Sequence, residues 1–278
     1  MTIIFDQYEE RLERVKRSPT TRYHFRKAAD GLTEYLHEQG LTPETADGID
    51  LEEYFASLPY AASTKKLHLS HLKAAFGYAL RRGTVTKDPT VDVLIEREPD
   101  KEPAVIPNAE LREMKARLVT DREWLLWHLL VYTGMRRHEL LALKWGDVKL
   151  ADHTITIVGK GGKLRHVPIH PALYDVLVER GEHEPEQYVL ANRRGGGLLP
   201  MSRRKFWDVL KCITREKYQA HAFRRTVASS LYANGVPGDT IDKILGWSPR
   251  SVRTRYYQAV ADAQLQRAIL QLYRDDPI

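Results

Sequence analysis

A polar stretch that contains prolines, E-R-E-P-D-K-E-P-A-V-I-P between Glu96 and Pro107, divides the 278-residue chain. Charged residues and prolines at this density interrupt helices and strands, and such a composition is typical of a linker between domains. The chain is also long enough to bury two separate cores. We therefore expect a first domain over residues 1–97, a linker over residues 98–107 and a second domain over residues 108–278.

Hydrophobic spacing predicts that the first domain is entirely helical. One helix is expected to begin at Pro19 and run to Gly40, and a shorter one covers Ile49–Leu58. Ser63 is expected to cap a third helix, which Gly83 ends. Apolar residues recur at helical spacing along this third helix, namely Leu69, Leu72, Phe76, Ala79 and Leu80.

The second domain is expected to combine helices with one short hairpin. Helices are predicted over Asn108–Leu118 and Asp121–Thr133, and Gly134 ends the latter. Alternating residues over 153–158 and 164–169, joined by G-K-G-G-K, are typical of a β-hairpin. The predicted fold class is therefore mainly α with a small antiparallel β-sheet. Further helices are predicted to begin at Pro171, Ser202, His221, Pro237, Pro249 and about Val260.

The composition argues against a secreted or a membrane protein. Cys212 is the only cysteine, so no internal disulfide can form, and the N-terminal residues lack the basic and apolar regions of a secretory signal. The most apolar stretch, Trp124–Tyr132, is far shorter than the roughly 20 residues that span a bilayer. We expect a cytoplasmic, nucleoid-associated protein without a membrane partner.

Two separate stretches are rich in basic residues, although the formal net charge of the chain is only +6. Ser63–Lys87 contains six Lys or Arg and no acid, and Arg193–Arg225 contains ten Lys or Arg and two acids. Such blocks suit a protein that binds a polyanion such as DNA from two sides, although a solvated helix face is also often basic. The residues that we expect to bind are Lys65, Lys66, Lys73, Arg81 and Arg82 in the first block, and Arg193, Arg194, Arg203, Arg204 and Lys205 in the second.

The motif T-G-M-R-R-H-E-L over residues 133–140 contains a candidate anion-binding arginine. Gly134 is expected to place Arg136 at the start of a helix, where backbone N–H groups favour an anion and a guanidinium adds a bidentate grip on phosphate. Glu139 follows one helical turn later and can hold that guanidinium in place. The alternative interpretation is a helix start with an internal ion pair.

Two further motifs contain candidate proton-transfer groups. Lys160 lies between glycines in G-K-G-G-K, where a tight turn can push an ammonium into a DNA groove to protonate a leaving oxygen. Lys163 is the second candidate for the same role. In H-A-F-R, His221 and Arg224 are three residues apart and share one helix face, which combines an imidazole with a second guanidinium.

The last motif is L-G-W, which ends at Trp247, with Tyr256 nine residues later. The indole N–H of Trp247 can donate to phosphate even where the ring packs in a core. Tyr256 and Tyr257 are adjacent and would point about 100° apart on a helix, so only one can face a phosphate. Phosphodiester transfer without metal needs cations, a nucleophile, a base and an acid, and these motifs supply all four.

Together, in this order and spacing, the motifs resemble those of the tyrosine recombinase family, which includes the phage integrases and the Xer recombinases. The resemblance runs from about Pro19 to the C-terminus. Trp247 stands where the family usually has histidine, and the family's nine-residue spacing selects Tyr256 as the nucleophile. On this resemblance, Glu139 and Lys163 are supporting residues, and the catalytic residues are Arg136, Lys160, His221, Arg224, Trp247 and Tyr256.

The resemblance implies a site-specific recombinase that cleaves and rejoins DNA through a 3′-phosphotyrosyl intermediate and a Holliday junction, with neither metal nor other cofactor. It also implies that the first domain is a core-binding domain, which clamps double-stranded DNA core sites together with the catalytic domain. Protomers would form a homotetramer on DNA by exchanging a C-terminal helix; the alternative is that this helix folds back on its own domain, as in a monomer free of DNA. The tail has a fitting apolar stripe, which consists of Leu265, Ala268, Ile269 and Leu272.

Several alternatives stay open from the sequence. A type IB topoisomerase or a hairpin-forming resolvase would use the same catalytic set without exchanging DNA partners, and an inactive relative would only bind DNA. The chain begins close to the core-binding helices, so we expect a short form without an arm-binding domain. The motifs do not separate a phage integrase from a host Xer-type enzyme, and they leave open whether an accessory directionality factor takes part.

Overall fold

The computed structural model describes residues 2–96, 104–159, 162, 164–194, 197–247 and 262–278. The chain forms two compact units, Met1–Lys101 and Glu102–Ile278, and the division falls inside the stretch that the sequence predicts as a linker. The described residues are mostly helical with small antiparallel sheets, which confirms the predicted fold class. No helix among these residues has both the length and the apolar character needed to cross a membrane.

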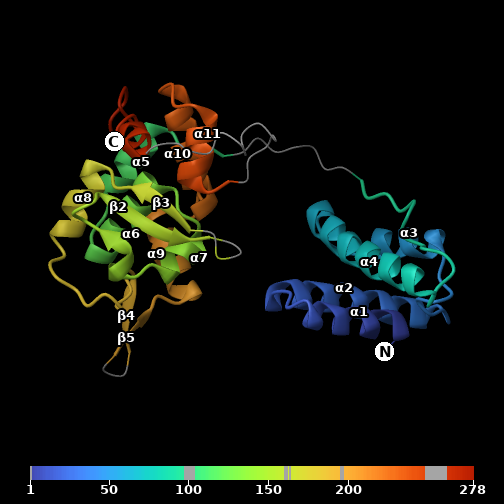
Figure 1. Ribbon diagram of the computed structural model, residues 1–278. Helices are drawn as coiled ribbons and strands as arrows, with labels where there is room; N and C mark the ends of the chain where they lie inside the picture. The colour runs from blue at the N-terminus through green and yellow to red at the C-terminus, as the bar shows by residue number, and fades with distance from the viewer. Residues whose placement is uncertain (1, 97–103, 160–161, 163, 195–196, 248–261) are drawn as a thin grey trace. The chain divides into compact units, whose positions relative to one another are not determined.

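The described residues of the first unit form four helices (Figure 1): α1 (Ile3–Arg14), α2 (Pro19–Glu38), α3 (Gly48–Ser57) and α4 (Ala62–Arg82). The sequence interpretation did not delimit α1, whose Phe5 packs edge-on against Phe25 and Phe76 at ring separations of 6.1 and 5.7 Å. Gly83 ends α4 with a φ of 72°, as predicted. Ser63 does not cap α4, because the helix already begins at Ala62 after an N-cap residue without a side-chain hydrogen bond.

The second unit contains two hairpins among helices. Its helices are α5 (Asn108–Ala116), α6 (Asp121–Thr133), α7 (Arg137–Ala142), the short 3₁₀-helix η1 (Trp145–Asp147), α8 (Pro171–Val178), α9 (Arg203–Thr214), α10 (Ala220–Ala233), α11 (Gly238–Leu245) and α13 (Asp262–Ile269). The strands are β1 (Val148–Lys149), β2 (Thr154–Val158), β3 (Leu164–Pro168), β4 (Ala191–Arg194) and β5 (Gly197–Pro200). The predicted helix start at Pro249 lies outside the described residues.

The predicted hairpin is present as β2 and β3, and β1 pairs with β2 to complete a three-stranded antiparallel sheet. In this register Ile155 lies opposite Val167 and Ile157 opposite Arg165, so Arg165 takes an inward-facing position on the sheet. A second hairpin, β4–β5, projects from the unit (Figure 1) and was missed. The residues that form it, A-N-R-R-G-G-G-L-L-P, do not alternate between polar and apolar.

The core of the second unit forms around α6, which is buried on all sides. Every residue from Leu125 to Thr133 is buried, and Trp127 has no exposed surface. Helices α8, α9 and α10 pack against α6. A helix that is apolar all round needs this complete cover. As a result, the end of α6 at Gly134 is fixed among neighbouring elements.

The C-terminal segment packs on its own unit. Leu265, Ala268, Ile269 and Leu272 are at most 6% exposed, and α13 contacts α11 and β3. The apolar stripe that the sequence assigned to a neighbouring protomer is therefore covered by the same chain in this structure. The physical reason is that an amphipathic helix needs an apolar cover, which the second unit of the same chain supplies. Tyr273 completes the contact by donating its phenol O–H to the carbonyl of Val131 at 3.2 Å.

Candidate active site

The second unit contains a cavity of about 240 Å³ at the meeting point of α7, α9 and α10. Three of the predicted site residues, Arg136, His221 and Arg224, line it together. The other lining residues are Met135, Arg137, His138, Trp207, Gln219 and Ala220. Residues almost ninety positions apart in the sequence are thus brought to one concave surface, which is the usual form of a binding site.

Gly134 determines how Arg136 enters this cavity. Its φ of 56° ends α6 in the left-handed region that glycine adopts without strain. A Cβ at this position would lie only 2.8 Å from Leu245 Cδ2, so the side chain of Leu245 would have to shift. Arg136 then becomes the N-cap residue of α7 rather than its first helical residue. Its side chain is 32% exposed, so it is accessible from the cavity.

Glu139 is a buried carboxylate shared by two arginines. Its Oε1 accepts from Arg136 Nη1 at 3.0 Å and from Arg165 Nη1 at 2.8 Å. Its Oε2 accepts from the Arg136 backbone N–H at 2.8 Å and from Arg165 Nη2 at 2.7 Å. Burial alone would raise the pKa of Glu139, but the hydrogen bonds and charge of Arg165 and Arg136 outweigh it and hold the pKa at about 2.

Arg224 is a buried cation without an acidic partner among the described residues. Its residue surface is 1% exposed, its Nη1 donates to the carbonyl of Gly134 at 2.8 Å, and its Nη2 donates to the carbonyl of Leu245. The Nε atom is buried without a hydrogen-bond partner in the described structure. Burial lowers the pKa of Arg224 to about 9, and the charge of Arg136 contributes in the same direction. An anion in the cavity would offset both effects.

His221 lies at the edge of the same cavity, on the first turn of α10. Desolvation lowers the pKa of its imidazole, and the cations Arg225, Arg224 and Arg136 lower it further. The ring is therefore mainly neutral at pH 7 and can accept a proton. Phe223 is 1% exposed and packs in the core, as expected from the H-A-F-R pattern.

The three guanidinium groups also hold the end of α11. Arg165 Nε donates to the carbonyl of Ile244 at 3.1 Å, and Arg136 Nη2 donates to the carbonyl of Gly246 at 3.1 Å. With the bond from Arg224 to Leu245, three consecutive carbonyls at this helix end each accept one guanidinium N–H. Cations at a helix C-terminus are favoured because the unpaired carbonyls carry partial negative charge.

Trp247 follows this helix end directly. Its ring centroid lies 5.3 Å from Cζ of Arg224, which is a cation–π distance. Tyr256, Lys160 and Lys163 lie outside the described residues, as does Tyr257, so their predicted roles stay predictions. Gly162 of the same turn has a φ of 78°, which fits a tight glycine turn.

Several residues of the site were missed by sequence reasoning. Arg165 lies in the second predicted strand of the hairpin, residues 164–169, and its signal was a charged residue at an inward-facing strand position. Trp207 is half-buried on α9, and the guanidinium of Arg137 lies 5.3 Å from its ring centroid. The sequence pattern gives no sign that Trp207 lies near Arg136, because only the packing of α9 against α6 brings it there.

The predicted DNA-binding residues occupy helix surfaces and a hairpin. Lys66, Lys73, Arg81 and Arg82 are exposed on α4, while Lys65 is half-buried. None of these five forms an ion pair within the part of the chain that the structure describes. Two more groups lie in the second unit. Arg203, Arg204 and Lys205 are exposed in the first turn of α9, and the backbone of Arg193 and Arg194 belongs to β4.

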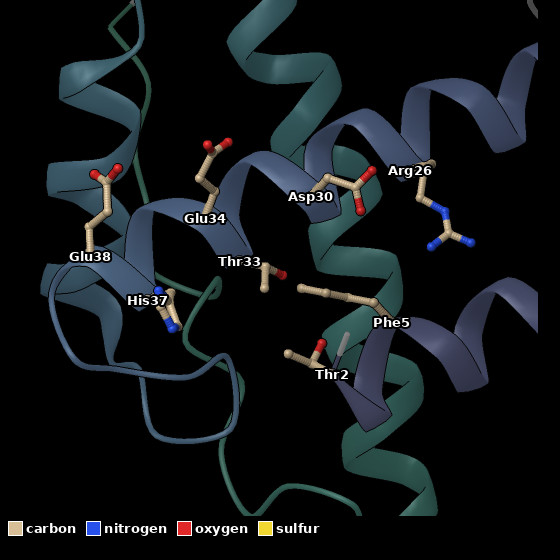
Figure 2. Close-up of a pocket in the computed structure, with 8 residues that line it drawn as sticks. All are labelled: Thr2, Phe5, Arg26, Asp30, Thr33, Glu34, His37 and Glu38. Carbon is tan, nitrogen blue, oxygen red and sulfur yellow. The ribbon is translucent and has the colours of Figure 1, made fainter.

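A larger cavity of about 470 Å³ lies in the first unit, between α2 and the start of α1 (Figure 2). Asp30, Glu34 and Glu38 recur every four residues along α2 at its edge. Arg26 also lines it but is paired with Glu9. This acidic lining does not suit a phosphate. Among the described residues, no group of three or more His, Cys, Asp or Glu side chains is arranged to hold a metal ion.

Comparison of the sequence with known proteins supplies the family. The model of the phage integrase family matches residues 108–264. The tyrosine recombinase XerC of Myxococcus xanthus is 30% identical over 231 residues, which cover 76% of this chain and 76% of the relative. The tyrosine recombinase XerD of Listeria monocytogenes serotype 4b (strain F2365) is 25% identical over 258 residues, covering 84% of this chain and 86% of the relative.

Solved structures share the fold. The Tn1549 transposon integrase, in complex with a circular intermediate DNA, has a TM-score of 0.69 at 18% identity and covers 96% of this chain and 100% of its own. A lambda integrase tetramer bound to a Holliday junction also has a TM-score of 0.69 at 18% identity, covering 90% of this chain and 77% of its own. Since the family model spans more than half of the chain and XerC matches most of it, the chain belongs to the phage integrase family of tyrosine recombinases, which are site-specific recombinases that cleave and religate DNA.

Proposed function

We propose that Tyr256 is the nucleophile of this recombinase and that the cavity of Arg136, His221 and Arg224 binds the DNA phosphate that it attacks. The phenol oxygen forms a bond to phosphorus as the bond to the 5′-oxygen breaks, which leaves a 3′-phosphotyrosyl link. The phenol proton goes to His221, and Lys160 or Lys163 gives a proton to the departing 5′-oxygen. A 5′-hydroxyl of a partner strand then reverses the reaction and produces the Holliday junction.

The unbalanced charge of the cavity is the observation that best supports this proposal. Arg136 and Arg165 share the carboxylate of Glu139, and the buried guanidinium of Arg224 forms no ion pair among the described residues. Burying unpaired cations is costly, so such an arrangement is favourable only where an anion is bound. A phosphate gains negative charge on its equatorial oxygens during transfer, and preorganised donors are worth most at that point. The Nε–H of Arg224, which has no hydrogen-bond partner in the described structure, is one such donor.

His221 supports the assignment of a base. Because its pKa is lowered, the imidazole is neutral at physiological pH and can accept the phenol proton. Its position on the same cavity wall as Arg224 places base and phosphate-binding cation together. The neutral ring also adds no further charge to an already cationic cavity.

The partner of the enzyme is double-stranded DNA at core sites, and we propose a homotetramer as the active assembly. A lambda integrase dimer bound to a core site and a tetramer bound to a Holliday junction are among the solved structures of this fold. In such an assembly α13 would leave its own unit and dock on a neighbouring protomer. An accessory directionality factor remains a prediction, and the enzyme would act in the cytoplasm, where the nucleoid lies.

Trapping the covalent intermediate tests the proposal. The protein is incubated with fragmented genomic DNA of its source organism, and the DNA that stays attached in detergent is sequenced. A nicked duplex of that sequence, which loses its 5′-hydroxyl fragment after cleavage, then serves as the substrate. Tyr256→Phe should bind this duplex without forming an adduct, while the matched variant Tyr257→Phe should still form one. An adduct on Tyr257, located by mass spectrometry, would overturn the assignment.

The roles of the cations have separate tests on the same substrate. Arg136→Ala and Arg224→Ala should each slow cleavage on the order of a hundredfold to a thousandfold, with a smaller change in DNA affinity, as expected for stabilisers of a transition state. Equal losses of rate and affinity would indicate simple phosphate anchoring. A 5′-phosphorothiolate needs no acid to leave, so it should restore cleavage in Lys160→Ala. If the 5′-phosphorothiolate restores cleavage in Lys163→Ala but not in Lys160→Ala, Lys163 is the acid.

Strand exchange distinguishes the recombinase from its alternatives. A topoisomerase-like enzyme would form the adduct but would relax or reseal a single duplex. A DNA-binding relative would form no adduct at all. Recombined DNA from two duplexes that carry the captured site would therefore identify a recombinase.

A further inference from the structure

We infer that Arg165 is a positioning residue of the recombination site: its guanidinium joins strand β3 to Glu139 and to the end of α11, and so fixes the geometry of Arg136 and of the chain that leads to Tyr256. This inference rests on the proposed function of the cavity. Arg165 does not line the cavity, so it acts through the residues that it holds.

The contacts of Arg165 involve three elements. It extends from an inward-facing position of β3, and its side chain is only 9% exposed. Nη1 and Nη2 form a two-pronged contact with both oxygens of Glu139 on α7, at 2.8 and 2.7 Å. Nε donates to the carbonyl of Ile244 on α11 at 3.1 Å. A planar guanidinium can make these contacts at once, whereas the ammonium of lysine is a point charge without this fork.

Gly246 shows how closely the site is built around this side chain. A Cβ on Gly246 would lie 2.9 Å from both Cδ and Nη1 of Arg165. The φ of Gly246 is also 65°, a conformation that glycine adopts without strain. The glycine of the L-G-W motif therefore serves two purposes, since it turns the chain at the end of α11 and leaves room for Arg165. The segment that continues to Trp247 starts from a backbone that Arg165 touches directly.

The second effect of Arg165 is on the charge of Arg136. If Glu139 were paired with Arg136 alone, the pair would have no net charge and would attract a phosphate only weakly. Because Arg165 shares the same carboxylate, the three groups together keep one positive charge. Glu139 can then orient Arg136 through Nη1 and the backbone N–H without neutralising it. This is a physical reason for placing a second arginine behind the carboxylate.

The position of Arg165 along the chain connects it to the candidate acid as well. β3 begins at Leu164, directly after the G-K-G-G-K turn that contains Lys160 and Lys163. Anchoring Arg165 therefore anchors the strand that follows this turn. The same side chain thus connects three elements of the proposed site. These are β3, which follows the turn with Lys160 and Lys163, helix α7, which begins after Arg136, and the end of α11, which precedes Trp247.

Arg165→Lys and Arg165→Met test the inference on the nicked substrate under single-turnover conditions. Each should slow covalent-complex formation by about tenfold or more, while DNA affinity changes by less than about threefold, because each variant removes an interaction that acts in the transition state. Arg180→Lys is the matched control, since Arg180 lies in the same unit and also bonds a backbone carbonyl, that of Asp121. It should cleave at the wild-type rate.

A double-mutant cycle separates positioning from general stability. If Arg165 acts through Arg136, Arg165→Lys combined with Arg136→Ala should cleave within about twofold of Arg136→Ala alone, because coupled residues are not additive. Losses that multiply would overturn the route through Arg136, and equal losses of rate and affinity in Arg165→Lys would overturn the inference as a whole. Thermal unfolding identifies a variant that fails to fold. Should Arg165→Met do so, Arg165→Lys, which keeps the charge, carries the test.

The pH profile supplies a readout that a purely structural role would not change. The charged groups facing Glu139 are Arg136 from α7, Arg165 from β3 and Arg224 from α10. Without the hydrogen bonds of Arg165, burial should raise the pKa of Glu139, so Arg165→Met should lose cleavage activity at a higher pH than wild type on the acid side. When Glu139 is replaced by glutamine, which does not titrate, Arg165→Met should no longer change the pH at which cleavage activity is lost. An acid limb that is unchanged in Arg165→Met would count against the inference.

The proposed function can fail independently of this inference. If the wild-type protein forms no adduct, or if Arg136→Ala cleaves as fast as wild type, the cavity is not the phosphate site. If both behave as proposed and only the Arg165 variants cleave normally, the function stands and the positioning role of Arg165 is wrong.

Discussion

The guanidinium of Arg224 lies over the ring of Trp247, with Cζ 5.3 Å from the ring centroid, while its Nη2 donates to the carbonyl of Leu245 two residues earlier. The buried cation is thus held between a helix end and an aromatic face. On the family resemblance, Trp247 stands where a histidine is usual, and we propose that this contact gives the tryptophan a role that does not require its N–H. A cation–π contact of this kind is worth about 0.5–2 kcal/mol.

The first prediction concerns this contact. Trp247→Ala should slow cleavage by about two- to thirtyfold, the range that corresponds to removing a cation–π interaction of about 0.5–2 kcal/mol. Trp247→Phe keeps an aromatic face and should lose less. Single-turnover cleavage of the nicked duplex measures both. Equal losses in the two variants would show that the indole N–H, and not the ring face, is what the site uses.

Part of this site could be predicted from sequence alone, because some of its geometry is local. The turn at Gly134, the pairing of Glu139 with Arg136 and the common helix face of His221 and Arg224 all follow from spacings of three or four residues. The arrangement around Arg165 could not be predicted in this way. It joins β3, α7 and α11, and only the packed second unit brings these elements together.

The fold shows the same division between local and tertiary information. The helix ends at Gly83 and Gly134 and the β2–β3 register follow from glycine conformation and side-chain alternation. Hairpin β4–β5 lacks alternation, and the start of α4 lacks a side-chain cap, so neither boundary has a local signal. The position of α13 was also out of reach, since an apolar stripe shows that a helix needs a cover but not which surface provides it.

The second prediction concerns acid stability. Burial lowers the pKa of His170 from its ordinary value of 6.5 to about 4, and its ring stacks on Tyr132 at a centroid separation of 4.5 Å. The unfolded chain takes up this proton near pH 6.5, but the folded chain does so only near pH 4. The free energy of unfolding should therefore fall as pH drops through this window, on the order of 2 kcal/mol for this residue between pH 7 and pH 5.

Urea unfolding at pH 7 and pH 5 measures the effect. His170 is the N-cap of α8 and accepts from the backbone N–H of Ala172 at 3.2 Å. His170→Asn keeps a capping oxygen but removes the titrating group. It should reduce the difference in unfolding free energy between the two pH values. His128, whose pKa burial also lowers to about 4, accounts for part of the remaining difference. An undiminished difference in His170→Asn would contradict the prediction.

The third prediction concerns the face of α4 that we expect to contact DNA. Lys66 and Lys73 are seven residues apart and so lie on one side of the helix, whereas Arg82 lies on nearly the opposite side. Replacing both lysines with glutamine should flatten the slope of log affinity against log salt by roughly 0.9 for each phosphate that these lysines neutralise in the wild-type complex. Arg82→Gln is the contrast and should leave the slope nearly unchanged. The reverse result would place DNA on the other side of α4.

The last prediction concerns the C-terminal tail. One face of α5 holds the final residues of the chain. Arg112 Nη1 forms an ion pair with Asp276 at 2.5 Å and donates to the carbonyl of Pro277 at 2.8 Å, and Asn108 donates to the carbonyl of Asp276 at 2.8 Å. The pair is exposed, since the two side chains retain 46% and 57% of their surface. Its contribution to stability should therefore be small.

If α13 leaves its own unit to dock on a neighbouring protomer, loosening this tail should favour assembly. Arg112→Ala should have nearly the wild-type free energy of unfolding and should raise the fraction of tetramer on DNA that carries two captured sites, because the free energy needed to release the tail is smaller. Arg117→Ala is the matched control, since Arg117 is paired with Glu113 at 3.7 Å near the same helix. Sedimentation of the DNA complexes measures the tetramer fraction. Equal fractions in the two variants would show that the tail does not oppose assembly, and that tetramers form with α13 in its present position.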